Sequence, residues 1–135
     1  MARAASAPPA STEAVHGIVL FAHGARDPEW ARPFEAIRDR VRSARPECPI
    51  ALAFLEIMSP GLEEAVDAVI GEGASSITVF PLFMAQGGHL KQDLPRILDA
   101  IRAQRKHVPI SLETSVGEVP ELLDAISSWV LKRVD

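Results

Sequence analysis

The sequence predicts an α/β fold: a three-layer αβα sandwich around a four-stranded parallel sheet. Two observations support this prediction. Four short apolar runs lack the polar alternation of a half-exposed strand, which is typical of strands buried on both faces. Segments with helically spaced apolar residues separate these runs, and this alternation favours parallel strands joined by right-handed crossovers. The simplest strand order is 2-1-3-4, with a switch point between strands 1 and 3.

The first expected strand is "HGIVLFAH", residues 16–23. A helix follows in "DPEWARPFEAIRDRVRSA", where Asp27 suits the N-cap and Pro28 suits the first helical position. Four apolar residues of this segment share one helical face: Trp30, Phe34, Ile37 and Val41. The segment therefore predicts an amphipathic helix packed on the sheet.

The second expected strand covers residues 49–57. The helix after it is expected at 59–73, with Ser59 as the N-cap and Pro60 in the first position. The third strand, residues 75–83, is rich in β-branched and aromatic residues, which favour strands. These elements repeat the order of the first strand and helix.

A loop containing Gly87 and Gly88 leads to a third helix, expected near 93–105. A fourth strand at 108–113 and a closing helix at 120–134 complete the fold. The third helix carries the apolar residues Leu94, Ile97, Leu98 and Ile101, and the closing helix carries Leu122, Leu123, Ile126, Trp129 and Val130. Both helices should therefore cover the sheet.

The length of 135 residues fits one ordinary domain, which we expect at residues 15–135. Residues 1–14 are mostly Ala, Pro and Ser, and they predict a disordered tail. The net charge of −4 argues against a general nucleic-acid binder, and no apolar run is long enough for a membrane span. The single cysteine, Cys48, excludes an internal disulfide and fits a reducing compartment, so we expect a cytoplasmic protein.

Three side chains that commonly bind metals follow three of the strands. His23 ends strand 1, Glu56 ends strand 2, and His89 lies in the loop after strand 3. Ligand sites of open parallel sheets form outside the carboxyl ends of the strands, and neighbouring strands lie about 5 Å apart. The three side chains could therefore converge on one cleft. Two imidazoles and a carboxylate suit a first-row divalent metal, and they suit general bases equally well.

The possible chemistry of this protein is limited in two ways. Some single residues have structural roles, and several catalytic motifs are absent. A histidine at a strand end is often a structural residue, whereas a carboxylate after an apolar run, as at Glu56, is rarely buried without a partner. His16 and His107 are expected to be structural or solvated. The sequence has no P-loop, no dinucleotide-binding loop between a strand and a helix, and no G-x-S-x-G elbow. Ala22 stands where histidine phosphatases carry an arginine. The chemistry that remains is the handling of a metal ion by a protein that uses no ATP, no NAD and no covalent nucleophile.

Three segments resemble the small sirohydrochlorin chelatases of the CbiX type: "GIVLFAHGARDP", "FLEIMSPGLEEAV" and "VFPLFMAQGGHLKQDLP". These chelatases belong to the class II, ATP-independent tetrapyrrole chelatases. The resemblance covers about residues 16–133, and its most specific part runs from Pro81 to Pro95. Family members commonly carry "HGS" where this chain has "HGA", so Ala25 lacks the hydroxyl group.

The resemblance implies insertion of a divalent metal into sirohydrochlorin during cobalamin or sirohaem synthesis. Cobalt is the metal expected first, with iron or nickel as alternatives, and the metal is a substrate rather than a permanent cofactor. By position, His23 and His89 would bind the metal and Glu56 would be the acidic partner, but the sequence leaves open which residue is ligand and which is base. A short chain of this type is expected to form a homodimer. The alternative is a metal-binding or metal-delivery protein that catalyses nothing.

Five further residues are candidates for contact with the tetrapyrrole: Gly87, Gly88, Met84, Arg26 and Lys91. The glycines would let a flat ring approach the backbone, although a turn that needs positive φ accounts for them equally well. Met84, with Met58, Phe83 and Leu90, would form an apolar wall or belong to the core. Arg26 and Lys91 would contact the carboxylates of the substrate, because local charge matters more for docking than a net charge of −4.

Overall fold

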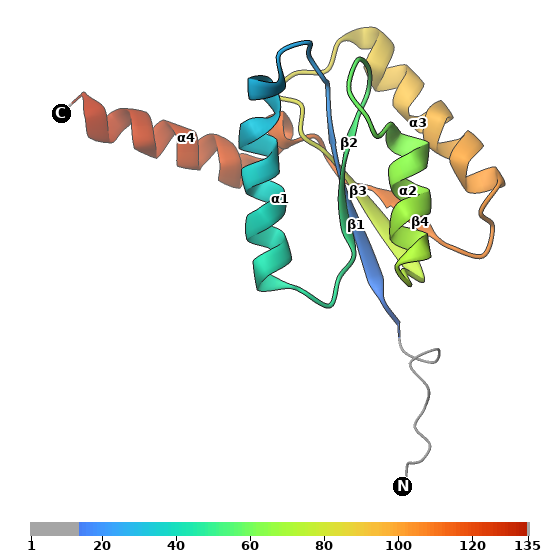
Figure 1. The fold of residues 1–135 in the computed structure, drawn as a ribbon. Coiled ribbons are helices and arrows are strands. Elements are labelled where there is room, and N and C mark those ends of the chain that lie inside the picture. The colour runs from blue at the N-terminus through green and yellow to red at the C-terminus, as the bar shows by residue number, and fades with distance from the viewer. Residues whose placement is uncertain (1–13, 135) are drawn as a thin grey trace, which may run out of the picture.

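The computed structural model describes residues 14–134 and confirms the α/β class. Its four parallel strands lie in the order β2-β1-β3-β4, as predicted (Figure 1). The strands are β1 (His16–Ala22), β2 (Ile50–Phe54), β3 (Ser76–Pro81) and β4 (Ile110–Leu112). The α-helices are α1 (Arg32–Ala44), α2 (Leu62–Gly71), α3 (Gly88–Ala103) and α4 (Pro120–Arg133), and two 3-10 helices are η2 (Pro28–Ala31) and η3 (Val116–Glu118). The predicted tail lies outside the described residues, except for Ala14.

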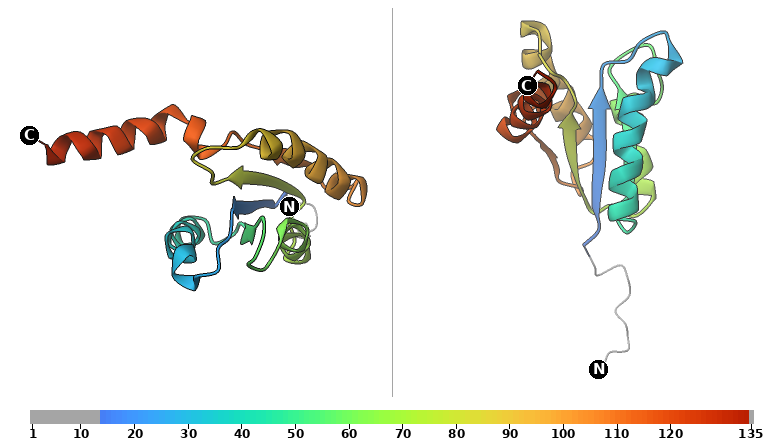
Figure 2. Two further views of the ribbon diagram at one scale, coloured as in Figure 1. Left: turned by 90° about the horizontal axis from the view of Figure 1, so that it is seen from above. Right: turned by 90° about the vertical axis from the view of Figure 1, so that its left-hand side faces the viewer.

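The core lies on both faces of β1, the central strand. Val19 and Phe21 point into a larger apolar cluster with α2 and α3, whereas Leu20 and Ala22 point into a smaller cluster with α1. This division follows from the alternation of side chains along a strand. Figure 2 shows α1 on one side of the sheet and α3 on the other. Burial on both faces explains why the strands lack polar alternation.

The strand register brings the ends of β2, β1 and β3 to one edge of the sheet. Ala22 lies opposite Phe54 of β2, and Phe21 lies opposite Pro81 of β3. The turns after β1 and β2 and the start of α3 lie at this edge (Figure 1). We call it the carboxyl edge, and the predicted site residues follow the strands there.

The first two predicted helices differ in detail from the structure. The first is divided into η2 and α1, although Asp27 caps it as predicted, because its Oδ1 accepts a 2.9 Å hydrogen bond from the N–H of Glu29. The prediction that Ser59 caps α2 is wrong. The N-cap is Gly61, whose N–H donates a 3.0 Å hydrogen bond to Oε1 of Glu64. This contact from the third helical residue fixes the start of α2 at Leu62.

The third helix begins earlier than predicted. It starts at Gly88, so His89 lies in the first turn of α3 and not in a loop. Glycines are tolerated there because the first N–H groups of a helix have no intrahelical partner. Pro95 lies inside the helix and removes one hydrogen bond. The buried side chains of Leu94 and Leu98 offset this loss by packing on the core.

The last helix departs most from the prediction. The apolar spacing of residues 120–134 predicts a helix that closes the sheet, yet every residue of α4 is exposed. Figures 1 and 2 show α4 projecting away from the body of the protein. Helical periodicity therefore identified the helix correctly but not the surface against which it packs. No helix within residues 14–134 is long and apolar enough to cross a membrane.

Candidate functional site

His23 and Glu56 form a pair at the carboxyl edge. The β1–β2 hydrogen bonding continues past both strands, with Leu55 N–H donating to the carbonyl of Ala22 (2.9 Å) and Glu56 N–H donating to that of His23 (3.1 Å). Nδ1 of His23 lies 4.0 Å from Oε2 of Glu56. This distance is too long for a hydrogen bond. Two ligands of one first-row cation, each bound at about 2.1 Å, also lie about 3 to 4 Å apart.

The pair is open to solvent on one side and supported on the other. The side chains of His23 and Glu56 are 51% and 59% exposed, so a metal ion can reach them. The His23 ring packs edge-on against Phe83, with ring centroids 5.4 Å apart. Phe83 is buried and packs in turn against Phe21. Phe83 therefore belongs to the core, one of the two roles expected for it, and supports the imidazole from there.

Gly24 allows the two turns to approach each other. Its φ is +99°, and a Cβ atom at this position would collide with the carbonyl group of Glu56. A residue with a side chain would therefore be strained and would push Glu56 away from His23. The glycine of "AHG" is thus explained by its backbone conformation and by this close contact.

A strained turn directly follows Glu56. Ile57 has a φ of 70°, and the carbonyl of Glu56 accepts a 2.7 Å hydrogen bond from the N–H of Met58. A bond across one intervening residue defines a γ-turn, which is rare at positive φ for a β-branched residue. Such strain costs about 1 to 3 kcal/mol and is concentrated at functional sites.

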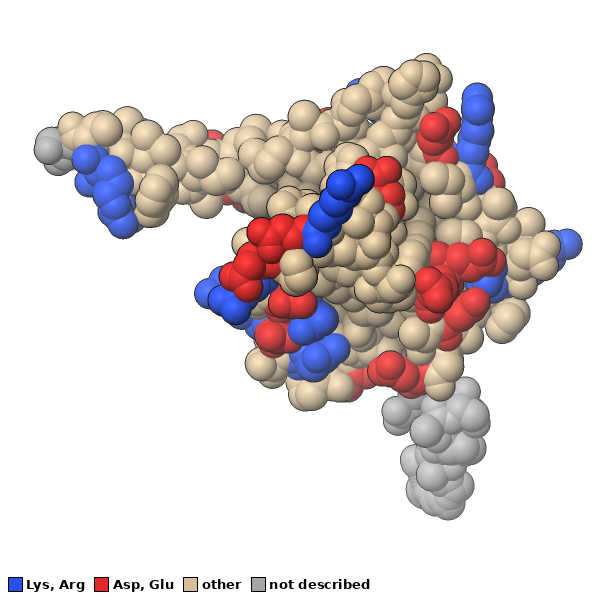
Figure 3. All heavy atoms as spheres, turned by 45° about the horizontal axis from the view of Figure 1, so that its top comes forward, with Lys and Arg blue, Asp and Glu red and all other residues tan. Residues whose placement is uncertain are grey.

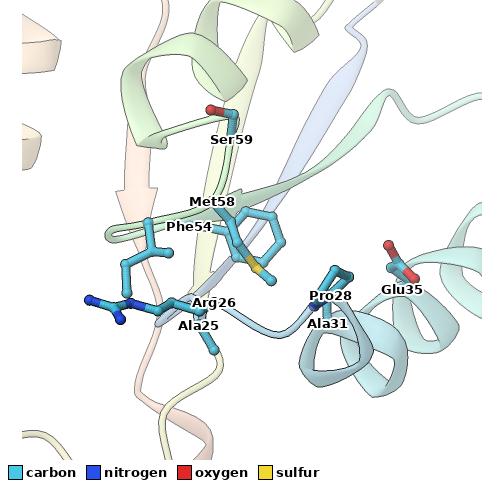
Figure 4. Close-up of a pocket in the computed structure, with 9 residues that line it drawn as sticks. Ala25, Arg26, Pro28, Ala31, Glu35, Phe54, Met58 and Ser59 are labelled. Carbon is cyan, nitrogen blue, oxygen red and sulfur yellow. The ribbon is translucent and has the colours of Figure 1, made fainter.

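A pocket of about 360 Å³ lies beside the pair. Figure 4 shows Arg26 and Glu35 at opposite ends of it, with Phe54 and Met58 between them. Its size falls within the roughly 300 to 1,000 Å³ of small-molecule sites. Ala25 also lines this pocket, so the missing hydroxyl leaves a methyl group there. The pocket offers an apolar surface between one cation, Arg26, and one carboxylate, Glu35, so only its Arg26 end suits a carboxylated ligand.

His89 is not part of the His23–Glu56 pair. It is exposed in the first turn of α3, together with exposed Lys91. Within residues 14–134, no three His, Cys, Asp or Glu side chains lie close enough together to hold one metal ion. The structure thus brings two of the three predicted ligands together and leaves the third at the same edge (Figure 1). The three-residue set stays a prediction.

The glycines before His89 do not serve a turn of positive φ. Gly87 is the N-cap of α3 with a φ of −66°, and Gly88 is not among the glycines of positive φ. The interpretation as such a turn is therefore wrong. A Cβ atom on either glycine would meet nothing within 4 Å, so the space in front of them is open. Met84, 60% exposed, lies in the same segment. Open space beside an exposed thioether leaves room for a flat ring.

Two residues that sequence reasoning missed hold this segment in place. The buried hydroxyl of Ser115 donates a 2.6 Å hydrogen bond to the carbonyl of Phe83, and the N–H of Gly117 donates another at 3.0 Å. A Cβ atom on Gly117 would collide with the carbonyl of Met84. No sequence pattern signals these contacts, because they join η3 to a segment more than 30 residues earlier. His16, by contrast, is structural as predicted, since its ring nitrogens bond the hydroxyls of Ser76 and Thr78.

The charges at the carboxyl edge are mixed. Figure 3 turns this edge toward the viewer and shows acidic and basic side chains interspersed, without a large patch of one sign. Long-range attraction of an anionic substrate is therefore weak. Binding of such a substrate depends on single cations, and Arg26 in the pocket is the best placed of them.

Comparisons with known proteins agree with the fold. A family model described as CbiX matches residues 17–132. A sirohydrochlorin cobaltochelatase from Saccharolobus islandicus is 30% identical over 121 residues, covering 88% of this chain and 93% of the relative. The crystal structure of a CbiX protein from Marinobacter aquaeolei, described as a putative cobalamin biosynthesis protein, is 33% identical. It covers 88% of this chain and 97% of that one, with a TM-score of 0.76.

A structure of the sirohydrochlorin chelatase SirB from Bacillus subtilis in complex with cobalt shares the fold, with a TM-score of 0.69 at 24% identity. The alignment covers 89% of this chain but only 51% of that one. The sheet, the pair at its carboxyl edge and the named relatives define an enzyme of the metal-chelatase class, as predicted. Within that class, the chain belongs to the CbiX family.

Proposed function

We propose that this protein inserts a divalent metal into sirohydrochlorin without ATP, on the route to cobalamin or sirohaem. Cobalt(II) is the metal we expect first, because relatives that match most of this chain are sirohydrochlorin cobaltochelatases. Iron(II) and nickel(II) accept the same nitrogen and oxygen ligands, so they remain alternative substrates. The observation that supports the proposal most directly is the exposed His23–Glu56 pair, which lies next to the pocket of Arg26.

The reaction requires a metal site that also accepts protons. Two pyrrole N–H protons leave the ring, and one divalent cation takes their place, so the charge of the ring centre does not change. The imidazole of His23 can bind the incoming metal in its neutral form and can accept a proton near neutral pH. The carboxylate of Glu56 neutralises part of the metal charge and offers a second proton acceptor. His89, across the open space before α3, is the proposed third ligand.

The substrate is proposed to lie between the pair and the start of α3. The open space at Gly87 and Gly88 gives a flat ring access to the backbone, and Met84 offers an apolar contact. Arg26, with Lys91 on α3, would bind peripheral carboxylates. Contacts of this kind, remote from the ring nitrogens, can supply the energy that bends the ring toward the metal.

The protein is further proposed to work as a homodimer. The metal pair is open on one side, and a pocket of about 360 Å³ would take up only part of a tetrapyrrole. A second copy can cover the rest of the ring. The relative SirB, of which this chain spans about half, is long enough for two such domains.

The proposal is tested by following the absorption spectrum of sirohydrochlorin after addition of cobalt(II), with and without the protein. We expect metal insertion to be faster with protein than the protein-free rate, and ATP to have no effect. A series with iron(II) and nickel(II) then ranks the metals. If no metal gives acceleration although the protein binds cobalt(II), the chain is a metal-binding protein and the chelatase proposal is wrong.

A further inference from the structure

The orientation of the His23 ring is set by a neighbour from the core. Nδ1 of His23 lies 4.0 Å from Oε2 of Glu56, which is beyond hydrogen-bonding distance, so Glu56 does not fix the imidazole. The ring instead stands edge-on to the ring of Phe83, with centroids 5.4 Å apart and an angle of 79° between the two planes. Aromatic rings favour this arrangement. Rotation of the imidazole away from Glu56 would break the contact.

Phe83 can orient a second ring because its own position is fixed. It is 4% exposed, and its ring also packs edge-on against Phe21, with centroids 5.6 Å apart. Protein interiors are packed about as densely as organic crystals, so a ring held on two sides has little room to move. The side chain of His23 is half exposed and is therefore free only on its solvent side. Phe83 defines the buried side of the His23–Glu56 pair.

The backbone of Phe83 is held by the segment that follows β4. Phe83 lies beyond the last residue of β3, and its carbonyl accepts two hydrogen bonds. One comes from the hydroxyl of Ser115 at 2.6 Å, and the other comes from the N–H of Gly117 at 3.0 Å. Ser115 is the one buried polar residue within residues 14–134. A hydroxyl in the core needs a hydrogen-bond partner, and Phe83 supplies it.

We propose that Phe83 and Ser115 are positioning residues for the metal that His23 and Glu56 bind. Ser115 fixes the carbonyl of Phe83, and the ring of Phe83 turns the imidazole so that its Nδ1 faces Glu56. Metal-binding histidines are usually oriented by a hydrogen bond from the second ring nitrogen, and loss of that support lowers metal affinity by about 10- to 100-fold. Here an aromatic contact orients the ring. This inference rests on the proposed function only in taking His23 and Glu56 as metal-binding residues.

A purely structural role of Phe83 and Ser115 makes a different prediction. Both are buried, so substitution of either lowers the free energy of unfolding whether or not it disturbs the metal site. The affinity for cobalt(II) separates the two roles, because it is a property of the folded protein. It is measured with cobalt(II) alone, well below the melting temperature of each variant. The visible absorption of bound cobalt(II) also reports the geometry of its ligands.

The first comparison replaces one of two phenylalanines. Phe83→Leu keeps a large apolar side chain but removes the aromatic contact with His23. We expect cobalt(II) to bind about tenfold more weakly, with an altered absorption spectrum. The matched control is Phe80→Leu, because Phe80 belongs to β3 and packs against the apolar cluster on the α1 side of the sheet. This control should bind cobalt(II) as wild type does. Equal losses in both variants, or no loss in Phe83→Leu, would overturn the proposal.

The second comparison removes one of two hydroxyl groups. Ser115→Ala should also weaken cobalt(II) binding, but less than Phe83→Leu does, because the N–H of Gly117 still bonds the same carbonyl. Ser115→Thr keeps the hydroxyl and should recover the affinity. The control is Ser111→Ala, since Ser111 of β4 donates a 3.4 Å hydrogen bond to another carbonyl of β3, that of Ile77. Unchanged binding in Ser115→Ala, an equal loss in Ser111→Ala, or no recovery in Ser115→Thr would overturn the role of Ser115.

The kinetic constants of metal insertion give a further readout. In Phe83→Leu we expect a lower kcat and a higher KM for cobalt(II). The KM for sirohydrochlorin should not change, because Phe83 is buried and no contact with the tetrapyrrole is lost. A change confined to the KM for sirohydrochlorin would contradict the positioning role and would assign Phe83 to the support of the substrate instead.

The positioning role and the proposed function can fail separately. A wild-type protein that binds cobalt(II) but accelerates no metal insertion would contradict the chelatase proposal, and the affinity comparisons would still decide the role of Phe83 and Ser115. Variants that bind cobalt(II) as tightly as an active wild type would contradict the positioning role alone. A wild-type protein that binds no cobalt(II) would overturn both.

Discussion

Two regions of the molecule hold their proposed site residues in different ways. One is formed by the ends of β1 and β2, and the other is the segment between β3 and α3. At the tips, hydrogen bonds beyond the strands fix His23 beside Glu56, and Gly24 leaves no space for a side chain. Before α3, the surroundings of Gly87 and Gly88 are open, and His89 is exposed. The His23–Glu56 pair is thus held by the sheet, whereas the segment before α3 borders open space.

Removing either histidine is the strongest test of this division. We expect His23→Ala to abolish the acceleration of metal insertion, a loss of about 100-fold or more, because it removes a metal ligand and a proton acceptor. His89→Ala should have a comparable effect if His89 completes the site. Both residues are exposed, so the circular dichroism spectrum and the melting temperature should not change. If both variants kept the full rate, the assignment of the metal site would be wrong.

Two glycine substitutions contrast the two regions directly. Gly24→Ala should lower the free energy of unfolding by about 1 to 3 kcal/mol because of its positive φ. It should also slow metal insertion by about 100-fold, because displacement of Glu56 by an ångström spoils the pair. Gly88→Ala should instead stabilise α3 by up to about 1 kcal/mol.

The rate of metal insertion by the Gly88→Ala variant then tests whether the tetrapyrrole ring occupies the open space in front of Gly88. A methyl group in this open space should raise the KM for sirohydrochlorin even though the protein is more stable. Urea denaturation and the spectral assay measure the two effects separately. A Gly88→Ala variant with an unchanged KM would show that the ring does not approach this position.

A smaller effect on the reaction is expected from the pocket beside the His23–Glu56 pair. Arg26→Ala should raise the KM for sirohydrochlorin about tenfold, which corresponds to about 1.4 kcal/mol of lost binding, and should change kcat little. The matched control is Arg40→Ala, which removes an exposed cation of α1 outside the pocket. Equal effects of both variants would mean that only the net charge matters and that Arg26 does not contact the substrate.

The smallest effect is expected far from the site, between α2 and the end of α3. Arg105 donates hydrogen bonds of 2.6 and 2.8 Å to the carboxylate of Asp67 and holds the pKa of that carboxyl below its usual range. A lowered folded-state pKa stabilises the protein above the unfolded value of about 3.9, and this stabilisation is lost as the pH falls through the folded pKa.

Asp67→Asn should therefore lower the free energy of unfolding at pH 7 by no more than about 1 kcal/mol, because Asp67 is more than half exposed. The difference from wild type should shrink as the pH falls from the unfolded-state pKa of about 3.9 through the lower folded-state pKa of Asp67. Urea denaturation over a pH series measures it, and the rate of metal insertion at pH 7 should not change. A difference independent of pH would show that the carboxylate charge contributes nothing.

The sequence predicted the strands and their order well, because β1 and β2 are largely buried on both faces and their composition reports that burial. It also placed His23 and Glu56 correctly at one edge, since both directly follow strands whose neighbours are set by the topology. Helix starts were less predictable. Gly61 caps α2, and Gly88 begins α3, because of contacts and exposure that a residue type alone does not reveal.

The features that the sequence did not settle concern contacts between distant residues. It left open whether Phe83 forms a wall for the substrate or belongs to the core, because the burial of Phe83 against Phe21 joins segments far apart in the chain. The bond from Ser115 to the carbonyl of Phe83 joins segments with no shared pattern. The apolar residues of α4 predicted a helix with a partner surface, and the structure shows that this surface is not on the nearest part of the sheet.

The common direction of the four strands has a practical consequence for experiments on this protein. β1 begins at the edge of the sheet opposite His23, and its 7 residues separate the two edges by about 20 Å (Figure 1). An affinity tag, a fluorophore or a solid support attached ahead of His16 would thus leave the site facing the solution. Attachment after Arg133 would add bulk to the free end of α4, so the two ends of the chain are unequal handles for immobilisation.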